Sequence, residues 1–171
     1  MSEGSSGGWD SRSGELPAAE AGPHPDQPAD QPGSKSGGPE RTDIYGMYRR
    51  AMDLLGRGSP AAAAQLLERA AAAEPDSRSI LEALARAQFD TRRYADAAGS
   101  FRRIVEASPT DDYAQFGLGL ALARTGNHGA AVEHLALAAA MRPDLRHYTD
   151  ALRSVRATLR ARNSVRSEEC D

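Results

Sequence analysis

The sequence predicts an all-α fold in which three stacked helical hairpins and a C-terminal capping helix follow a disordered tail. Three observations carry this prediction. The composition changes abruptly near residue 43, and the chain beyond it is rich in alanine, the best helix former, with no sustained strand-like alternation. Prolines recur at a spacing of 34 residues, at Pro75, Pro109 and Pro143. A fixed period of this length is typical of stacked supersecondary units.

Residues 1–43 are predicted to be a disordered acidic tail. They contain 8 Gly, 6 Pro and 7 Ser, with 8 acidic against 3 basic residues. So few apolar side chains cannot bury enough surface to offset the entropy of ordering the backbone. Two roles stay open for this tail. It is either a spacer or a docking peptide that folds on a partner through Trp9 and Leu16.

Each 34-residue unit is predicted to contain two helices joined by a short turn. Gly58 and Gly126 occupy two of these turns, and Pro60 stands at the first position of a helix, where its missing N–H costs nothing. The proline that closes each unit disfavours helical backbone at the residue before it. The predicted helices span 43–57, 60–74, 77–90, 94–108, 111–124 and 128–142.

Several columns agree when the sequence is shifted by 34 residues. One column is always small, one is large and apolar, and one is the closing proline. The small column is Ala63, Ala97 and Ala131, and the large column is Leu67, Phe101 and Leu135. With Leu84-Ala85 and Leu118-Gly119, these columns make residues 44–145 similar to three tandem tetratricopeptide repeats, about 44–77, 78–111 and 112–145. The resemblance implies a right-handed solenoid whose first helices line a concave, protein-binding face.

One more helix is predicted over about residues 145–162. Tyr148, Leu152, Val155 and Leu159 form an apolar stripe at helical spacing. No second helix completes this pair, so the stripe is expected to cap the exposed apolar face of the third repeat. The repeat domain would then span residues 44–166, and residues 163–171 are expected to fray.

Catalytic and metal chemistry is not expected. Cys170 is the single cysteine, and the four histidines show no H-E-x-x-H pairing. The sequence contains no P-loop, G-x-S-x-G or G-x-G-x-x-G motif. We therefore expect a protein that is not an enzyme and that has no cofactor and no metal.

The predicted binding face carries most of the aromatic residues of the repeats. Aromatic and methionine side chains are enriched at protein interfaces because they give a large contact area at low entropic cost. The resemblance implies that the face comprises Tyr45, Tyr48, Met52, Glu82, Arg86, Phe89, Tyr113, Phe116, Leu120 and Arg124. For Phe89 and Tyr113 a second role stays open, in which they pack between adjacent helices. The Lys, Asn and Arg of the family's carboxylate clamp are absent, since the matching positions hold Tyr48, Met52, Ala83, Tyr113 and Gly117. A peptide or helix with apolar contacts is the expected ligand.

The expected function is that of a cytoplasmic adaptor that binds another protein. The net charge of −3 argues against a bulk nucleic-acid binder, although the arginines of the last helix leave an acidic partner open. No apolar run is long enough to cross a membrane, and MSEGSSGGWD lacks the pattern of a secretory signal. Two alternatives are a secretion-type chaperone that holds an unfolded client and a self-assembling scaffold, so a homo-oligomer also stays open.

Overall fold

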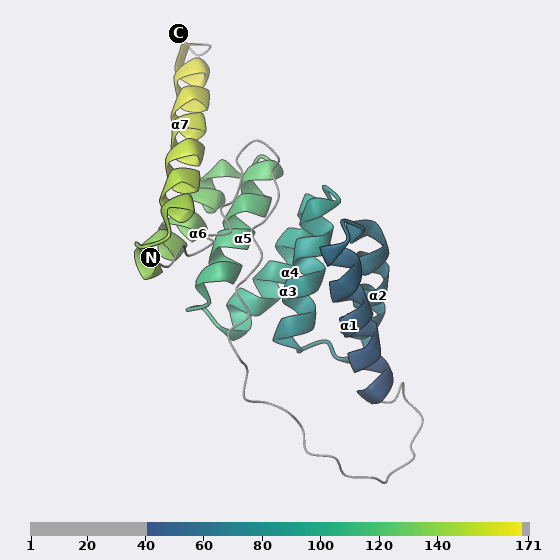
Figure 1. Ribbon diagram of the computed structural model, residues 1–171. Coiled ribbons are helices and arrows are strands. Elements are labelled where there is room, and N and C mark those ends of the chain that lie inside the picture. Colours follow the sequence, from purple (N-terminus) through teal and green to yellow (C-terminus); the bar gives the residue numbers. More distant parts are fainter. Residues whose placement is uncertain (1–40, 169–171) are drawn as a thin grey trace, which may run out of the picture.

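The computed structural model describes residues 41–168, and this part of the chain consists of α-helices without a strand. The helices pack as successive antiparallel pairs, from α1 and α2 at one end to α7 at the other (Figure 1). Their bounds are α1 Arg41–Gly56, α2 Pro60–Ala73, α3 Arg78–Asp90, α4 Tyr94–Ala107, α5 Asp112–Arg124, α6 His128–Met141 and α7 Arg146–Glu168. The fold is the predicted solenoid of three hairpins with a seventh helix.

The core of each hairpin is built from the columns seen in the sequence. The three alanines of the small column, Ala63, Ala97 and Ala131, are fully buried where paired helices cross. The three residues of the large column, Leu67, Phe101 and Leu135, are fully buried as well. Small side chains let the two helix backbones approach, and the large side chains fill the adjoining space. The predicted register is therefore confirmed.

The turn inside each hairpin ends the first helix in the same way. Gly58, Arg92 and Gly126, spaced 34 residues apart, have positive φ values of 72°, 62° and 87°. The amide of the following residue then donates to a carbonyl five residues earlier, as from Asn127 to Leu122 at 2.9 Å. This pattern is the Schellman C-cap, which favours glycine at the left-handed position. Arginine at position 92 is the exception.

Both ends of the predicted repeat domain differ from the structure. Helix α1 begins at Arg41, so residues 41–43 are helical, whereas the rest of the predicted tail lies outside the described residues. Helix α7 continues to Glu168 instead of ending at 162, so the expectation that residues 163–171 fray is wrong for 163–168. No Gly or Pro occurs between Pro143 and Glu168 to stop the helix.

The buried apolar residues form two clusters that divide along α3. One cluster joins α1 and α2 to the side of α3 that carries Ile80 and Leu84. The other begins at Leu81 and Phe89 on α3 and continues through α4, α5 and α6 to α7. None of the described helices is both long and apolar enough to cross a membrane.

Candidate functional site

The first helices of the pairs share one face of the molecule. Helix α3 contacts both α1 and α5. Burial raises the pKa of Tyr48 on α1, and the nearby charge of Glu82 on α3 raises it further. Burial likewise raises the pKa of Tyr113 on α5, with Glu82 again adding to the effect and Arg86 opposing it. Because α3 contacts both neighbours, α1, α3 and α5 adjoin one another, and Glu82 lies near enough to Tyr48 and Tyr113 to influence both.

The part of this face on α1 is open. Tyr45 is 62% exposed and Met52 is 38% exposed, and half-buried Tyr48 lies between them in the sequence. The spacing of three and four residues places all three on one side of the helix. The guanidinium of Arg49 lies 5.9 Å from the centre of the Tyr45 ring. We call Tyr45, Tyr48 and Met52 the α1 patch.

The part of the face on α5 is closed by α7. Phe116 is fully buried, and its ring stacks on Tyr148 with 4.3 Å between the ring centres. His147 meets the same ring edge-on at 5.3 Å. The Tyr148 hydroxyl donates to the Asp112 carboxylate at 3.0 Å, which fixes the position of α7 on α5. The prediction that Phe116 points into an open groove is therefore wrong.

Two more predicted groove residues are packing residues. Phe89 is 1% exposed, and its ring meets Tyr94 edge-on at 5.0 Å. Leu120 is 4% exposed and belongs to the core cluster that contains Phe116. Arg124 is exposed, but its guanidinium lies 5.8 Å from the Tyr94 ring centre. Phe89 thus has the packing role between helices that the sequence left open, and the prediction that Leu120 lines the groove is wrong because this side chain is buried in the core.

The middle of the face, on α3, is polar and partly buried. Glu82 pairs with Arg78 at 3.0 Å, and Arg78 also reaches Asp111 at 2.6 Å. These contacts join the start of α3 to the start of α5. Arg86 is half-buried, and its Nε atom is buried without a hydrogen-bond partner among the described residues. Of the ten predicted residues, Glu82 and Arg86 thus lie between the open α1 patch and the closed part on α5.

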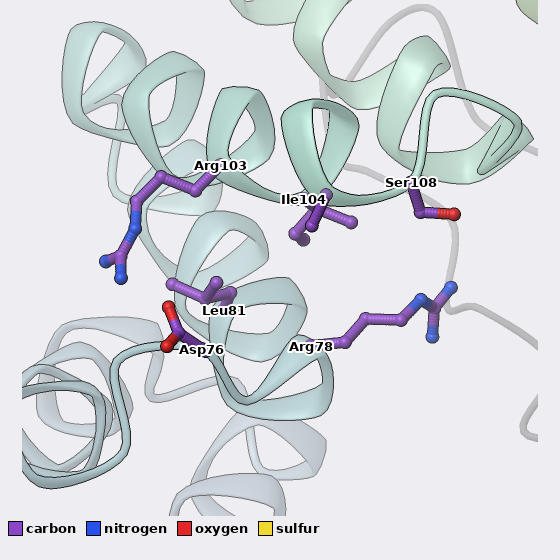
Figure 2. Close-up of a pocket in the computed structure, with 7 residues that line it drawn as sticks. Asp76, Arg78, Leu81, Arg103, Ile104 and Ser108 are labelled. Atoms are coloured by element: carbon purple, nitrogen blue, oxygen red, sulfur yellow. The ribbon is translucent and has the colours of Figure 1, made fainter.

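A small cavity between α3 and α4 was not predicted from the sequence. Figure 2 shows Leu81 and Ile104 facing each other across it, with Arg78 and Arg103 at its rim. Arg103 already donates to the Pro75 carbonyl, and Arg78 is held by Asp111. The cavity volume of about 160 Å³ is below the range of typical ligand pockets. It therefore does not resemble a cofactor site.

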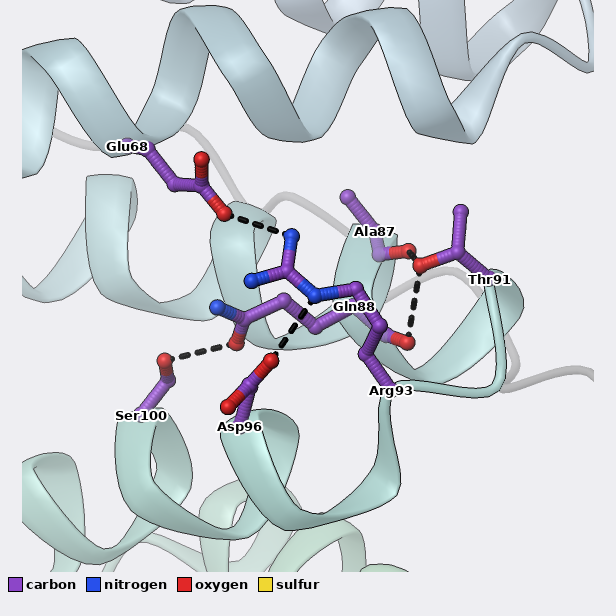
Figure 3. A network of polar contacts seen from close by, with 7 residues as sticks. All are labelled: Glu68, Ala87, Gln88, Thr91, Arg93, Asp96 and Ser100. Atoms are coloured by element: carbon purple, nitrogen blue, oxygen red, sulfur yellow. Dashed lines mark hydrogen bonds and ion pairs between the residues drawn. The ribbon is translucent and has the colours of Figure 1, made fainter.

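A polar network at the α3–α4 turn is structural. Figure 3 shows Arg93 between Glu68 of α2 and Asp96 of α4, at 2.6 and 2.8 Å. Beneath it, the buried Ser100 hydroxyl donates to the Gln88 side-chain oxygen at 2.8 Å. These bonds connect three helices. Within residues described by the structure, no three His, Cys, Asp or Glu side chains cluster as a metal site would require.

Comparisons with known proteins agree with this architecture. The family model described as a tetratricopeptide repeat matches residues 48–112 and 111–145, which together exceed half of the chain. No curated protein sequence matches the chain.

Solved structures of low identity share the fold. The first TPR of Spaghetti (RPAP3), bound to the HSP90 peptide SRMEEVD, is 16% identical with a TM-score of 0.65, and the match covers 70% of this chain and 95% of that one. The Sgt2 TPR domain from Aspergillus fumigatus is 16% identical with a TM-score of 0.64, covering 71% and 82%. The Yersinia enterocolitica secretion chaperone SycD, in complex with a peptide of the translocator YopD, is 13% identical with a TM-score of 0.63, covering 70% and 96%.

Proposed function

The chain belongs to the tetratricopeptide repeat family, and we therefore propose that it is a non-enzymatic adaptor that binds a segment of a partner protein. The proposed contact surface is the α1 patch together with the adjoining side chains of α3, Glu82 and Arg86. The proposed location is the cytoplasm. Two structurally similar proteins, RPAP3 and SycD, are described with a bound peptide, which supports this kind of activity for the present chain.

The exposure of the α1 patch carries the proposal. Tyr45 and Met52 are two of the four large hydrophobic side chains that are exposed among the described residues. Tyrosine is enriched among the residues that supply most of the binding energy at protein interfaces, and the flexible thioether of methionine is common at surfaces that bind other proteins. The buried rings of Phe89 and Phe116 are not available to a partner without unpacking the core.

The chemistry of the surface favours an extended or helical segment with apolar side chains. Tyr45, Tyr48 and Met52 offer two aromatic rings and a thioether, and Glu82 supplies a negative charge that is partly compensated by Arg78. The family's clamp for acidic C-terminal tails requires Lys and Asn on the first helix. In this chain the matching positions on α1 hold Tyr48 and Met52. An apolar anchor with a nearby basic or neutral group is the proposed ligand.

A secretion-type chaperone is the second candidate function. It is supported by the similarity to SycD, which is described in complex with a peptide of an exported translocator. The two candidates differ in the state of the partner. An adaptor binds a segment of a folded protein, whereas a chaperone keeps its client unfolded. Proteolysis of the partner, alone and in the complex, would separate the two functions.

The test of the α1 patch is affinity capture with the full chain and quantification of each captured protein. Tyr45→Ser combined with Met52→Ser should remove the partner, because losing two anchors commonly costs about 2–4 kcal/mol, or roughly 30- to 1,000-fold in affinity. Both side chains are exposed, so the helical circular dichroism signal should survive.

The matched control is Leu137→Ser, which removes an apolar side chain that is 50% exposed on α6. It should leave capture intact, as should Arg153→Ala combined with Arg156→Ala on α7. Capture that survives the α1 double variant but is lost with either control would overturn the proposed site. Tyr48→Ala with Phe116→Ala would be a poorer test, because Phe116 stabilises the contact with α7.

A further inference from the structure

Helix α7 exposes the side that a second helix covers in every complete repeat. In each complete repeat, one position of the first helix faces the second helix of the same repeat. Ala51, Ala85 and Gly119 occupy this position. Both alanines are fully buried, and a Cβ atom on Gly119 would lie 2.6 Å from Cγ of Leu135. The residue 34 positions after Gly119 is Arg153, whose side chain is 77% exposed. The structure describes contacts of α7 only with α5 and α6.

The arginine at this position is part of a basic face. Arg156 occupies the column of Leu122, which is buried, and Arg160 follows one turn later. All three side chains are exposed, and their spacing places them on one side of α7. Arg153 pairs with Asp150 at 2.9 Å, whereas no ion pair is seen for Arg156 or Arg160 within residues 41–168. We call Arg153, Arg156 and Arg160 the terminal face.

The chemistry of the terminal face suits an acidic occupant. A long arginine side chain leaves no room for the close helix contact that Ala85 and Gly119 permit, so a further repeat cannot continue the stack here. A second copy paired through the same face would bring like charges together, which is unfavourable. Carboxylates, in contrast, pair with guanidinium groups in a favourable bidentate geometry.

The chain itself contains such an occupant. Residues 1–40 hold seven acidic and two basic residues, a net charge of −5. Residues 146–168 hold six arginines and two acidic residues, a net charge of +4. For a chain of 40 residues, the random-coil relation gives a root-mean-square span of about 35 Å and full extension gives about 130 Å, enough to reach distant parts of a small domain. Its tether also gives it an effective concentration of about 1 mM.

We propose that residues 1–40 dock in cis on the terminal face, where their carboxylates occupy the place that a second helix takes in each complete repeat. The docking is electrostatic and therefore sensitive to salt. It is independent of the α1 patch, which lies at the other end of the solenoid (Figure 1). A partner that binds the terminal face would have to displace this segment.

Paramagnetic relaxation in the full-length chain tests the proposal. The variant Ser13→Cys with Cys170→Ser leaves one cysteine, within residues 1–40, to carry a nitroxide label. At low ionic strength the amide signals of residues 152–162 should lose at least half of their intensity relative to those of α2, because a dissociation constant near 1 mM at a similar effective concentration leaves about half of the molecules docked. The loss should vanish at about 1 M salt, where the Debye length is roughly 3 Å.

Charge variants in the labelled chain provide the controls. Changing Arg153, Arg156 and Arg160 together to Gln should abolish the signal loss on α7. The matched variant Arg50→Gln, Arg69→Gln, Arg102→Gln removes the same charge from exposed sites elsewhere and should preserve it. Equal attenuation of α2 and α7, or attenuation that persists in the terminal-face variant, would overturn the proposal. A further control mixes nitroxide-labelled chains with isotope-labelled chains that carry no nitroxide. Attenuation that appears only in this mixture would also overturn the proposal, since docking would then occur in trans.

Discussion

Arg92 is the one described residue other than glycine that has a positive φ value. It stands in the turn column that holds Gly58 and Gly126, and its side chain is exposed. The left-handed conformation costs a residue with a Cβ atom roughly 1–2 kcal/mol. The hydrogen bond from Arg93 to the Gln88 carbonyl, at 2.8 Å, keeps the turn in the same form as the other two. The second repeat therefore contains local backbone strain that the first and third avoid.

Replacing Arg92 by Gly should relieve this strain. We expect Arg92→Gly to raise the free energy of unfolding by about 0.5–1 kcal/mol, because the relief exceeds the extra entropy of glycine in the unfolded chain. Urea denaturation followed by circular dichroism measures the change. Gly126→Ala, at φ 87°, should act in the opposite direction by about 1 kcal/mol. A lower stability of Arg92→Gly would contradict the account of the turn.

Gly117 and Phe101 compensate each other in size. A Cβ atom on Gly117 would lie 2.4 Å from Cζ of Phe101, which is fully buried. At the positions that correspond through the 34-residue period, Leu67 stands with Ala83 and Leu135 stands with Ala151. The larger aromatic ring is thus matched with the smaller residue on the neighbouring helix.

A double-mutant cycle tests this compensation. Gly117→Ala should destabilise the protein by about 1–3 kcal/mol, because the added methyl group overpacks the core against the Phe101 ring. In the background of Phe101→Leu, the same change should cost much less, since the pair then matches those of the other repeats. Thermal unfolding of the four proteins gives the coupling energy. Additive effects of the two changes would argue against direct compensation.

At the scale of elements, the contact of α7 with α5 closes the C-terminal end of the solenoid. The stacked rings of Phe116 and Tyr148 form the centre of this contact, with His147 against the ring edge. Burial lowers the pKa of His147, and the positive charge of Arg142 lowers it further while Asp150 opposes the effect. Burial also lowers the pKa of His134, whose Nδ1 lies 2.7 Å from the side-chain oxygen of Gln115.

The lowered pKa values predict a dependence of stability on pH. Between its lowered folded-state pKa and its unfolded-state pKa of about 6.5, each histidine binds more protons in the unfolded chain than in the folded protein, so the free energy of unfolding falls as the pH falls through this interval. We expect stability to decrease from pH 7 to about pH 5.5, before most carboxylates begin to titrate. The variant His134→Gln with His147→Gln should lose most of this decrease in urea titrations. An unchanged pH dependence in the double variant would show that other groups cause it.

At the scale of the whole molecule, the two core clusters that divide along α3 imply uneven stability. In a repeat protein each unit contacts mainly its neighbours, so local unfolding is able to begin at one end. The cluster that joins α1 and α2 to α3 is the smaller, and it depends strongly on alanines such as Ala63 and Ala70. The larger cluster extends from α3 to α7 and contains Phe89, Phe101 and Phe116.

Hydrogen exchange should reveal this division. Leu67→Ala creates a cavity in the smaller cluster, where Leu67 is fully buried, and should cost about 2–5 kcal/mol. We expect amide protection to fall throughout α1 and α2 and to change little in α5 and α6. Leu135→Ala, the equivalent change in the larger cluster, should lower protection in α5 and α6 instead. Equal loss of protection across all helices in both variants would indicate one cooperative unit.

The helices, their register and their pairing could be predicted from the amino-acid sequence. Alanine content, turn residues and the 34-residue period are local or repeating signals, and the columns they define are the buried columns of the structure, as for Ala97 and Phe101. Tyr45 and Met52, two of the residues assigned to the predicted binding face, are exposed. These properties follow from helix geometry, which assigns each residue to a face without reference to distant parts of the chain.

Which parts of the predicted binding face stay exposed depends on how the helices pack. The 34-residue period assigned Phe116 to the concave side, but it could not show that Tyr148 of α7 would stack on the Phe116 ring. Helix periodicity identifies the apolar side of a helix and does not identify the element that covers that side. The same limit applies to Phe89, which Tyr94 covers, and to α7, whose arginines occupy positions where the earlier repeats accept a second helix. Exposure depends on contacts between residues far apart in the sequence, and those contacts exist only once the helices have packed.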